Sequence, residues 1–145
     1  MTALGPERFV EEIEPGMTYS VTRTFTESDV QAFADLVGDH NPVHMDEAYA
    51  SKTMYKTRIV HGAFVASLLS GIMGTQLPGP GAIFRALNLN YRGPVKIGDE
   101  VTATVEVDEV VPEKNSVKLK VYCQVRGLKV VRGDAMAWVA NRPSD

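Results

Sequence analysis

The absence of charge from Ile59 to Phe84 constrains the fold of this chain more than any other feature of its sequence. A helix that spans a bilayer needs roughly 20 mostly apolar residues. Here the apolar run gives way near Gly74 to a turn-rich segment that contains Pro78 and Pro80. The uncharged piece from Gly62 to Thr75 therefore predicts a helix that is buried on nearly all sides inside a soluble protein.

Strand-forming sequence dominates the chain after this helix. Gly and Pro separate several of the β-rich stretches, and alternation is clearest from Val101 to Val107, where every second residue is apolar. Such strands present one face to a core and the other to water. We expect an antiparallel meander of four strands, which are Ile83 to Tyr91, Glu100 to Val110, Ser116 to Arg126 and Leu128 to Ala140.

A strand and a helix are expected at the start of the domain, well before the apolar helix. Residues Met17 to Phe25 predict a strand. A helix follows, with Ser28 and Gln31 as its capping box and Gly38 as its C-terminal stop. The apolar face of that helix has the spacing i, i+3, i+4 and i+7 and consists of Val30, Phe33, Ala34 and Val37.

These elements predict the α+β class, with an antiparallel sheet wrapped around a long central apolar helix. A chain of 145 residues with 44% hydrophobic residues is long enough for one domain with a sizeable core. We expect an N-terminal extension over residues 1–16 and the domain over residues 17–145.

Charge and cysteine content narrow the possible partners and location. The formal net charge is -3 and the basic residues are scattered, which disfavours nucleic-acid binding. The single Cys123 cannot form an intramolecular disulfide, and the N-terminus lacks a basic region followed by an apolar one. We expect a cytoplasmic protein without a membrane anchor.

A segment with proton-handling side chains lies between the first helix and the apolar one. It places Asp39 and His44 five positions apart, on a stretch that Pro42 is expected to keep from being helical. A carboxylate and an imidazole on one stiff loop indicate acid/base chemistry. Directly after them, Asp46 is the expected N-cap of a short helix through Ala50.

Several motifs together resemble a known family. They are Phe33-Ala34, Gly38-Asp39-His40-Asn41-Pro42-Val43-His44-Met45-Asp46, Ile59-Val60-His61-Gly62, Leu77-Pro78-Gly79 and Val95-Lys96-Ile97-Gly98-Asp99-Glu100-Val101. With their spacing, these residues resemble the MaoC-type, (R)-specific enoyl-CoA hydratases of the hot-dog fold, over roughly Met17 to Ala140. Val37 departs from the family, which often has Ser or Thr there.

The resemblance implies a catalytic site. Asp39 and His44 correspond to the catalytic pair of the family, and the backbone N–H of Gly62 corresponds to the donor to the thioester oxygen. Hydration of a 2-enoyl thioester requires a base near the water, a proton donor for Cα and a donor to the carbonyl oxygen. We expect syn addition, with Asp39 as the favoured base, although the sequence leaves the formal base open.

Other residues of these motifs have alternative interpretations. Asn41, His61 and Ser70 are possible substrate-lining residues. Ser70 could equally bond the carbonyl four residues back, and His61 could fix the start of the helix by hydrogen bonding. Taken singly, Asp39 could cap its loop and His44 could be a packed or surface histidine. His40, at a variable position of the motif, is expected to be a lining or surface residue.

No metal and no cofactor are expected, because coenzyme A would be part of the substrate. His40 and His44 are four residues apart, but the Asn41-Pro42 step between them argues against one continuous helical face. The expected partners are an acyl-CoA or acyl-carrier-protein thioester and a second copy of the chain, in a homodimer or an assembly of dimers.

Two other functions remain open from the sequence. A hot-dog acyl-CoA thioesterase typically needs a carboxylate on the central helix, and Gly62 to Leu77 contains no Asp or Glu. A non-catalytic acyl-thioester binding module would keep the scaffold without turnover. The intact Asp39 and His44 disfavour that alternative.

Overall fold

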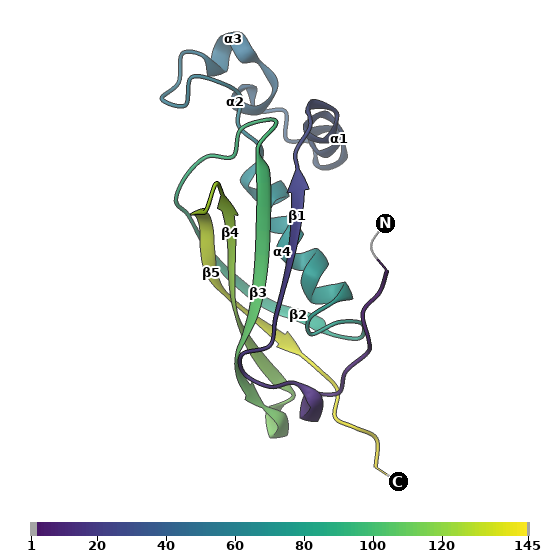
Figure 1. Cartoon of the computed structure of the whole chain (residues 1–145). Helices are drawn as coiled ribbons and strands as arrows, with labels where there is room; N and C mark the ends of the chain where they lie inside the picture. The colour runs from purple at the N-terminus through teal and green to yellow at the C-terminus, as the bar shows by residue number, and fades with distance from the viewer. Residues whose placement is uncertain (1–2, 145) are drawn as a thin grey trace.

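Helix α4, Gly62–Thr75, lies along one face of an antiparallel sheet in the computed structural model, which describes residues 3–144 (Figure 1). Its bounds are those that the sequence predicts. The sheet has five strands, which are β1 Thr18–Thr24, β2 Ile83–Tyr91, β3 Glu100–Val111, β4 Ser116–Val125 and β5 Leu128–Trp138. The expected α+β class, with a sheet around one central helix, is confirmed.

The strand order corrects one expectation. The strands are arranged β1-β3-β4-β5-β2, and all neighbours are antiparallel. Only β3, β4 and β5 form a meander, because β2 pairs with β5 rather than with β3. This pairing carries β2 to the far side of α4, so that the helix contacts β1, β2, β3 and β4. Sequence patterning predicts strands but does not say which strands pair.

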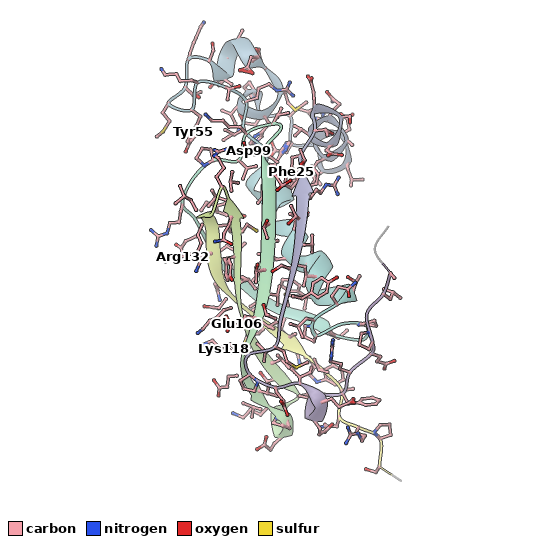
Figure 2. The ribbon with its side chains drawn as sticks, viewed as in Figure 1. Phe25, Tyr55, Asp99, Glu106, Lys118 and Arg132 are labelled. Carbon is pink, nitrogen blue, oxygen red and sulfur yellow. The ribbon has the colours of Figure 1, made fainter. Side chains whose placement is uncertain are left out.

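The core lies between α4 and the sheet. Alternate residues of β3 and β4 are buried, as their sequence pattern predicts, and the other residues face away from the core. Figure 2 shows Glu106 and Lys118 among these polar outward side chains. The buried residues of the two strands meet the buried face of α4, which consists of Val65, Ala66, Leu69, Ile72 and Met73.

One face of α4 is exposed in the single chain, contrary to the prediction of burial on nearly all sides. The exposed residues are small and uncharged. Burial against the sheet therefore explains the absence of charge on only one face of this helix. They are Ala63, Ser67, Ser70, Gly71 and Gly74.

Helix α1, Glu27–Val37, begins closer to β1 than expected. Its capping box is Thr26 with Asp29, in which Thr26 Oγ1 accepts from the Asp29 amide and Asp29 Oδ2 accepts from the Thr26 amide. The predicted pair of Ser28 and Gln31 is therefore wrong, because two overlapping sequences fit the capping pattern. The C-terminal stop is confirmed, since Gly38 has a φ of 81° in the left-handed region.

The predicted apolar face of α1 is only partly buried. Val30 and Ala34 are fully buried, and the ring of Phe33 stacks on Phe64 of α4 at a centroid distance of 4.6 Å. Val37, in contrast, is 55% exposed. Figure 1 shows α1 at the same end of the molecule as α2 and α3.

The segment after Asp39 is helical, which corrects the expectation drawn from its proline. Helix α2, Pro42–Met45, is a single turn with Pro42 at its first position, where a missing N–H costs nothing. Asn41 before it has a φ of -54° and a ψ of 128°, outside the helical region, as a residue before proline should be. Helix α3, Glu47–Ala50, has the predicted N-cap, because Asp46 Oδ1 accepts from the Tyr49 amide at 3.1 Å.

The N-terminal residues pack against the opposite end of the molecule. The short 3-10 helix η1, Val10–Glu12, includes the fully buried Val10, whose amide donates to the Ala140 carbonyl at 2.8 Å. A second 3-10 turn, η2 Pro112–Lys114, joins β3 to β4. The boundary expected between residues 16 and 17 stays a prediction. Across residues 3–144, no helix has the length and apolar character that crossing a membrane requires.

Candidate active site

The imidazole of His44 is held in place by its surroundings. Its Nδ1–H donates to the Ile59 carbonyl at 2.8 Å, so the neutral ring has its free lone pair on Nε2. The backbone carbonyl of His44 accepts from Arg58 Nε at 2.6 Å, and Arg58 also pairs with Glu27 of α1 at 2.8 Å. Helix α2 and the segment before α4 thus fix the ring orientation together.

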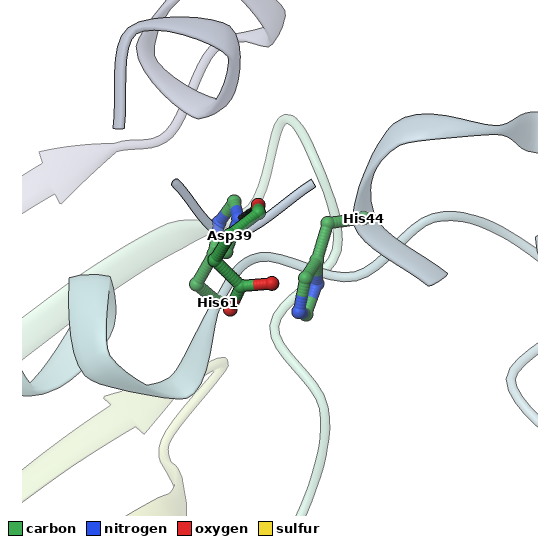
Figure 3. A group of neighbouring side chains, drawn as sticks. All are labelled: Asp39, His44 and His61. Atoms are coloured by element: carbon green, nitrogen blue, oxygen red, sulfur yellow. Dashed lines mark hydrogen bonds between the residues drawn. The ribbon is translucent and has the colours of Figure 1, made fainter. Parts of the chain in front are cut away.

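The carboxylate of Asp39 lies next to this ring. Figure 3 shows it directed toward the imidazole of His44. Its Oδ1 also accepts from the Asn41 amide at 3.2 Å, which closes a tight turn before α2. Asp39 therefore caps its loop and faces His44 at once, so the two interpretations from the sequence do not exclude each other. Its exposure in the single chain leaves the carboxylate open to solvent.

His61 ties the loop to the start of α4. Its Nε2–H donates to the Asp39 backbone carbonyl at 3.0 Å, and its ring lies 4.0 Å from that of His44 between centroids. This agrees with the interpretation that His61 fixes the helix start. Burial lowers the pKa of His61, so the ring stays neutral, and its buried Nδ1 has no hydrogen-bond partner among residues 3–144.

The burial of His61 predicts a pH-dependent stability. The unfolded chain takes up a proton near the usual pKa of 6.5, whereas the folded state resists it, so stability present above pH 6.5 is lost as the pH falls. We therefore compare the fall in melting temperature from about pH 7.5 to about pH 5.5 in two proteins. This fall should be smaller in His61→Gln, which keeps a side-chain N–H donor, than in the unchanged protein. Thermal unfolding by circular dichroism measures this. Equal losses in both proteins would contradict the prediction.

The three side chains bring their polar atoms together. One nitrogen or oxygen atom each from Asp39, His44 and His61 lies within 4.8 Å of the others. A single water that hydrogen-bonds at about 2.8 Å can bridge two atoms at such a separation. Two imidazoles and a carboxylate are also a donor set that Zn²⁺ accepts. His40 is not part of this group, because it is exposed and pairs with Asp35 at 2.8 Å.

The amide end of α4 is next to this cluster. The amides of Phe64 and Val65 both bond to the His61 carbonyl, whereas those of Gly62 and Ala63 have no partner among residues 3–144. Free N–H groups at a helix N-terminus favour a negatively charged oxygen.

A cavity of about 210 Å³ joins the histidine to this helix end. His44 and Gly62 both line it, and most of the other lining residues are apolar. Among these are Tyr55, Ile59, Val65, Tyr91, Val95 and Val131. The cavity therefore places an apolar pocket beside an imidazole and two unpaired amides.

Two of the possible substrate-lining residues lie elsewhere. Asn41 caps α2, since its Oδ1 accepts from the Val43 amide at 3.2 Å, and it does not line this cavity. Ser70 lines a separate groove of about 550 Å³ between α4 and β2. Within residues 3–144, the Ser70 hydroxyl does not donate to the carbonyl four residues back, which was the alternative interpretation. The hydroxyl of Thr75 does make such a bond, to the Gly71 carbonyl at 2.6 Å.

Sequence reasoning did not find the roles that three residues have in shaping the site. Tyr55 and Tyr91 line the cavity, and Arg58 holds the His44 carbonyl. Tyr55 lies in the loop beside α3 (Figure 2), and Tyr91 is the last residue of β2. No motif marks them, because the tertiary fold brings these segments to the helix end.

Comparison with known proteins agrees with this fold. The MaoC like domain model matches residues 8–129, which is most of the chain. The chain therefore belongs to the MaoC-like domain family, and the resemblance that its motifs indicate is confirmed.

Relatives of similar length are named as hydratases or dehydratases. The chain is 46% identical to an (R)-specific enoyl-CoA hydratase of Rhodospirillum rubrum over 92% of its length and 93% of that protein. It is 41% identical to a 3-hydroxybutyryl-CoA dehydratase of Methylorubrum extorquens, over 92% of its length and 85% of that protein. Among solved structures, the (R)-hydratase from A. caviae involved in PHA biosynthesis superposes with a TM-score of 0.86 at 38% identity, covering 89% of this chain and 98% of that one. The expected hot-dog fold is confirmed.

Proposed function

We propose that this protein is a hydro-lyase that adds water reversibly to trans-2-enoyl-CoA thioesters and forms (R)-3-hydroxyacyl-CoA. The observation that carries the proposal is that Asp39 lies beside His44, which lines one apolar cavity together with Gly62 and its free amide. The names of the relatives support the same reaction.

The proposed mechanism places one water between Asp39 and His44. Both free atoms, the Asp39 carboxylate oxygen and His44 Nε2, accept hydrogen bonds, so the water can donate one hydrogen to each. Asp39 then takes a proton as the hydroxyl bonds to Cβ, and His44 orients the water. The proton on Asp39 passes to Cα. Both additions come from one face of the substrate, which gives syn addition.

The thioester oxygen is proposed to lie at the N-terminus of α4. Negative charge builds on this oxygen as the hydroxyl adds, and the Gly62 N–H is positioned to donate to it. The positive end of the helix dipole acts in the same direction. Losing one such donor costs on the order of 3 kcal/mol of transition-state stabilisation.

One assay separates the candidate functions. Purified protein mixed with crotonyl-CoA should lower the enoyl absorbance without releasing thiol. Free thiol would indicate a thioesterase, and neither change, with crotonyl-CoA bound, would indicate a binding module. The helix α4 contains no carboxylate, which disfavours hydrolysis. Crotonyl attached to an acyl-carrier protein, tested in parallel, identifies the carrier.

We propose that the reaction needs no metal, although the donor set of Asp39, His44 and His61 could accept one. General acid/base chemistry with a backbone donor accounts for every proton in the mechanism. We expect dialysis against EDTA to leave kcat for crotonyl-CoA unchanged, and metal analysis by mass spectrometry to find less than stoichiometric Zn²⁺. A loss of activity that added Zn²⁺ restores would contradict this.

We further propose a cytoplasmic homodimer that pairs through β2. This strand is at the edge of the sheet, and its exposed apolar side chains include Ile83 and Phe84. An unpaired apolar edge favours pairing with another strand. A second β2 strand would pair with this edge and extend the sheet across the two copies.

Sedimentation velocity tests the dimer. The unchanged protein should sediment with twice the mass of the 15.8 kDa chain. Phe84→Asp should shift it toward the monomer, because a charge on the paired edge is desolvated in the dimer. Leu128→Asp is the matched control, since Leu128 is 74% exposed at the β4–β5 turn, away from this edge. A Phe84→Asp protein that remains dimeric would contradict pairing through β2.

A further inference from the structure

We propose that the ring of Tyr91 is a movable wall that sets the length of the acyl chain accepted by the site. This inference rests on the proposed function, because it assumes that an acyl thioester occupies the cavity beside His44. It assigns a specificity-determining role to one side chain.

Tyr91 separates two hollows of the molecule. It lines the cavity of about 210 Å³ that contains His44 and Gly62, and it also lines the groove of about 550 Å³ between α4 and β2. Of the residues that the structure describes, it is the one that both linings share. The ring thus lies where the two spaces would otherwise join.

The ring is seated directly on the helix start. A Cβ on Gly62 would lie 2.7 Å from Cε1 of Tyr91, so the ring occupies the space next to the Gly62 Cα. An acyl chain whose thioester oxygen is at the Gly62 amide therefore meets the ring as it lengthens. The wall is close to the reacting end of the substrate.

The small cavity has room for a short chain. The cavity of about 210 Å³ is less than half the size of the groove of about 550 Å³, so it accommodates a short acyl chain more readily than a long one. A longer chain has to pass Tyr91 into the groove.

No polar contact holds the Tyr91 ring. Its side chain is half exposed in the single chain, and its hydroxyl has no hydrogen-bond partner within residues 3–144, so rotation would break no hydrogen bond. The groove behind it is apolar apart from two serines, with Ala66, Phe84, Leu87 and Leu89 in its lining. Its occupant is therefore proposed to be the distal acyl chain, and Ser70 contacts substrate only when the chain extends past Tyr91.

Binding of saturated acyl-CoA tests the wall without requiring turnover. Titration calorimetry would measure Kd for butyryl-CoA and octanoyl-CoA with the unchanged protein, Tyr91→Ala, Tyr91→Leu and Tyr91→Phe. We expect Tyr91→Ala to shift the ratio of the two Kd values toward octanoyl-CoA by on the order of tenfold, the effect of burying about two more methylene groups. Tyr91→Leu should shift it less, and Tyr91→Phe should leave it near that of the unchanged protein.

Thermal melting of each variant shows that the comparison is between folded proteins, and Tyr91→Leu keeps the test valid should Tyr91→Ala unfold. An unchanged ratio in the folded truncated variants would overturn the proposal. An equal shift in Tyr91→Phe would also overturn it, because the hydroxyl and not the ring would then set the length. A failure of the crotonyl-CoA assay would reject the hydratase and leave these binding ratios interpretable.

Discussion

Asp39→Asn is expected to lower kcat/KM for hydration of crotonyl-CoA at least about 100-fold, and His44→Ala to do the same. The amide of asparagine cannot take the proton of the water, and alanine removes the nitrogen that orients it. Both changes should leave the fold intact. Asp39 is exposed, and the amide oxygen of asparagine can still accept from the Asn41 amide. His44→Ala loses one hydrogen bond to the Ile59 carbonyl, and its melting temperature shows whether the variant is folded. Steady-state kinetics that follow enoyl absorbance measure the loss.

His40→Ala is the matched control for this pair. His40 belongs to the same motif, but its ring pairs with Asp35 on the surface and is outside the cluster of Asp39, His44 and His61. Its removal should change kcat/KM by less than about threefold, as expected for a surface pair of small energy. Near-normal turnover in Asp39→Asn or His44→Ala would reject the proposed catalytic roles.

Gly133→Ala is expected to have the largest effect on stability. A Cβ on Gly133 would lie only 1.8 Å from the backbone oxygen of Asn88 in β2, and neither backbone can move without disturbing the β2–β5 pairing. Overpacking typically costs about 1–3 kcal/mol and occasionally more. We expect a loss of at least about 3 kcal/mol, or roughly 10 °C in melting temperature.

The control for that change is another glycine close to β2. A Cβ on Gly93 would be 3.6 Å from Val130 Cγ1, an ordinary van der Waals distance, so Gly93→Ala should shift the melting temperature by only a few degrees. Differential scanning calorimetry compares the two variants. If Gly133→Ala is as stable as Gly93→Ala, the prediction is wrong. Strand β2, which carries Tyr91, could then move away from β5 without loss of stability.

Local sequence patterns predicted much of the fold. The bounds of α4 and β2 match those expected, because an uncharged helical run and a β-rich stretch bounded by turns depend only on neighbouring residues. The motif positions of Asp39, His44 and Gly62 were also predictable, and the structure places Asp39 beside His44, which lines one cavity with Gly62. Their catalytic roles stay a proposal that the variants above test.

Local patterns failed where two of them competed or where a rule had an exception. Thr26 with Asp29 and Ser28 with Gln31 fit the same capping rule, and the end of β1 decided for the first pair. Pro42 was expected to prevent a helix, but at the first position of a helical turn it has no hydrogen bond to lose.

By itself, the sequence determined the types of the elements, the order in which they follow and the residue types available for acid/base chemistry, because each is fixed by periodicity, capping and chemistry over a few positions. Only the tertiary structure decided that β2 crosses to β5, that one face of α4 is left exposed, and that Tyr91 lies on Gly62. Each of these depends on contacts between segments far apart in the chain, and the packing of the whole domain selects such contacts.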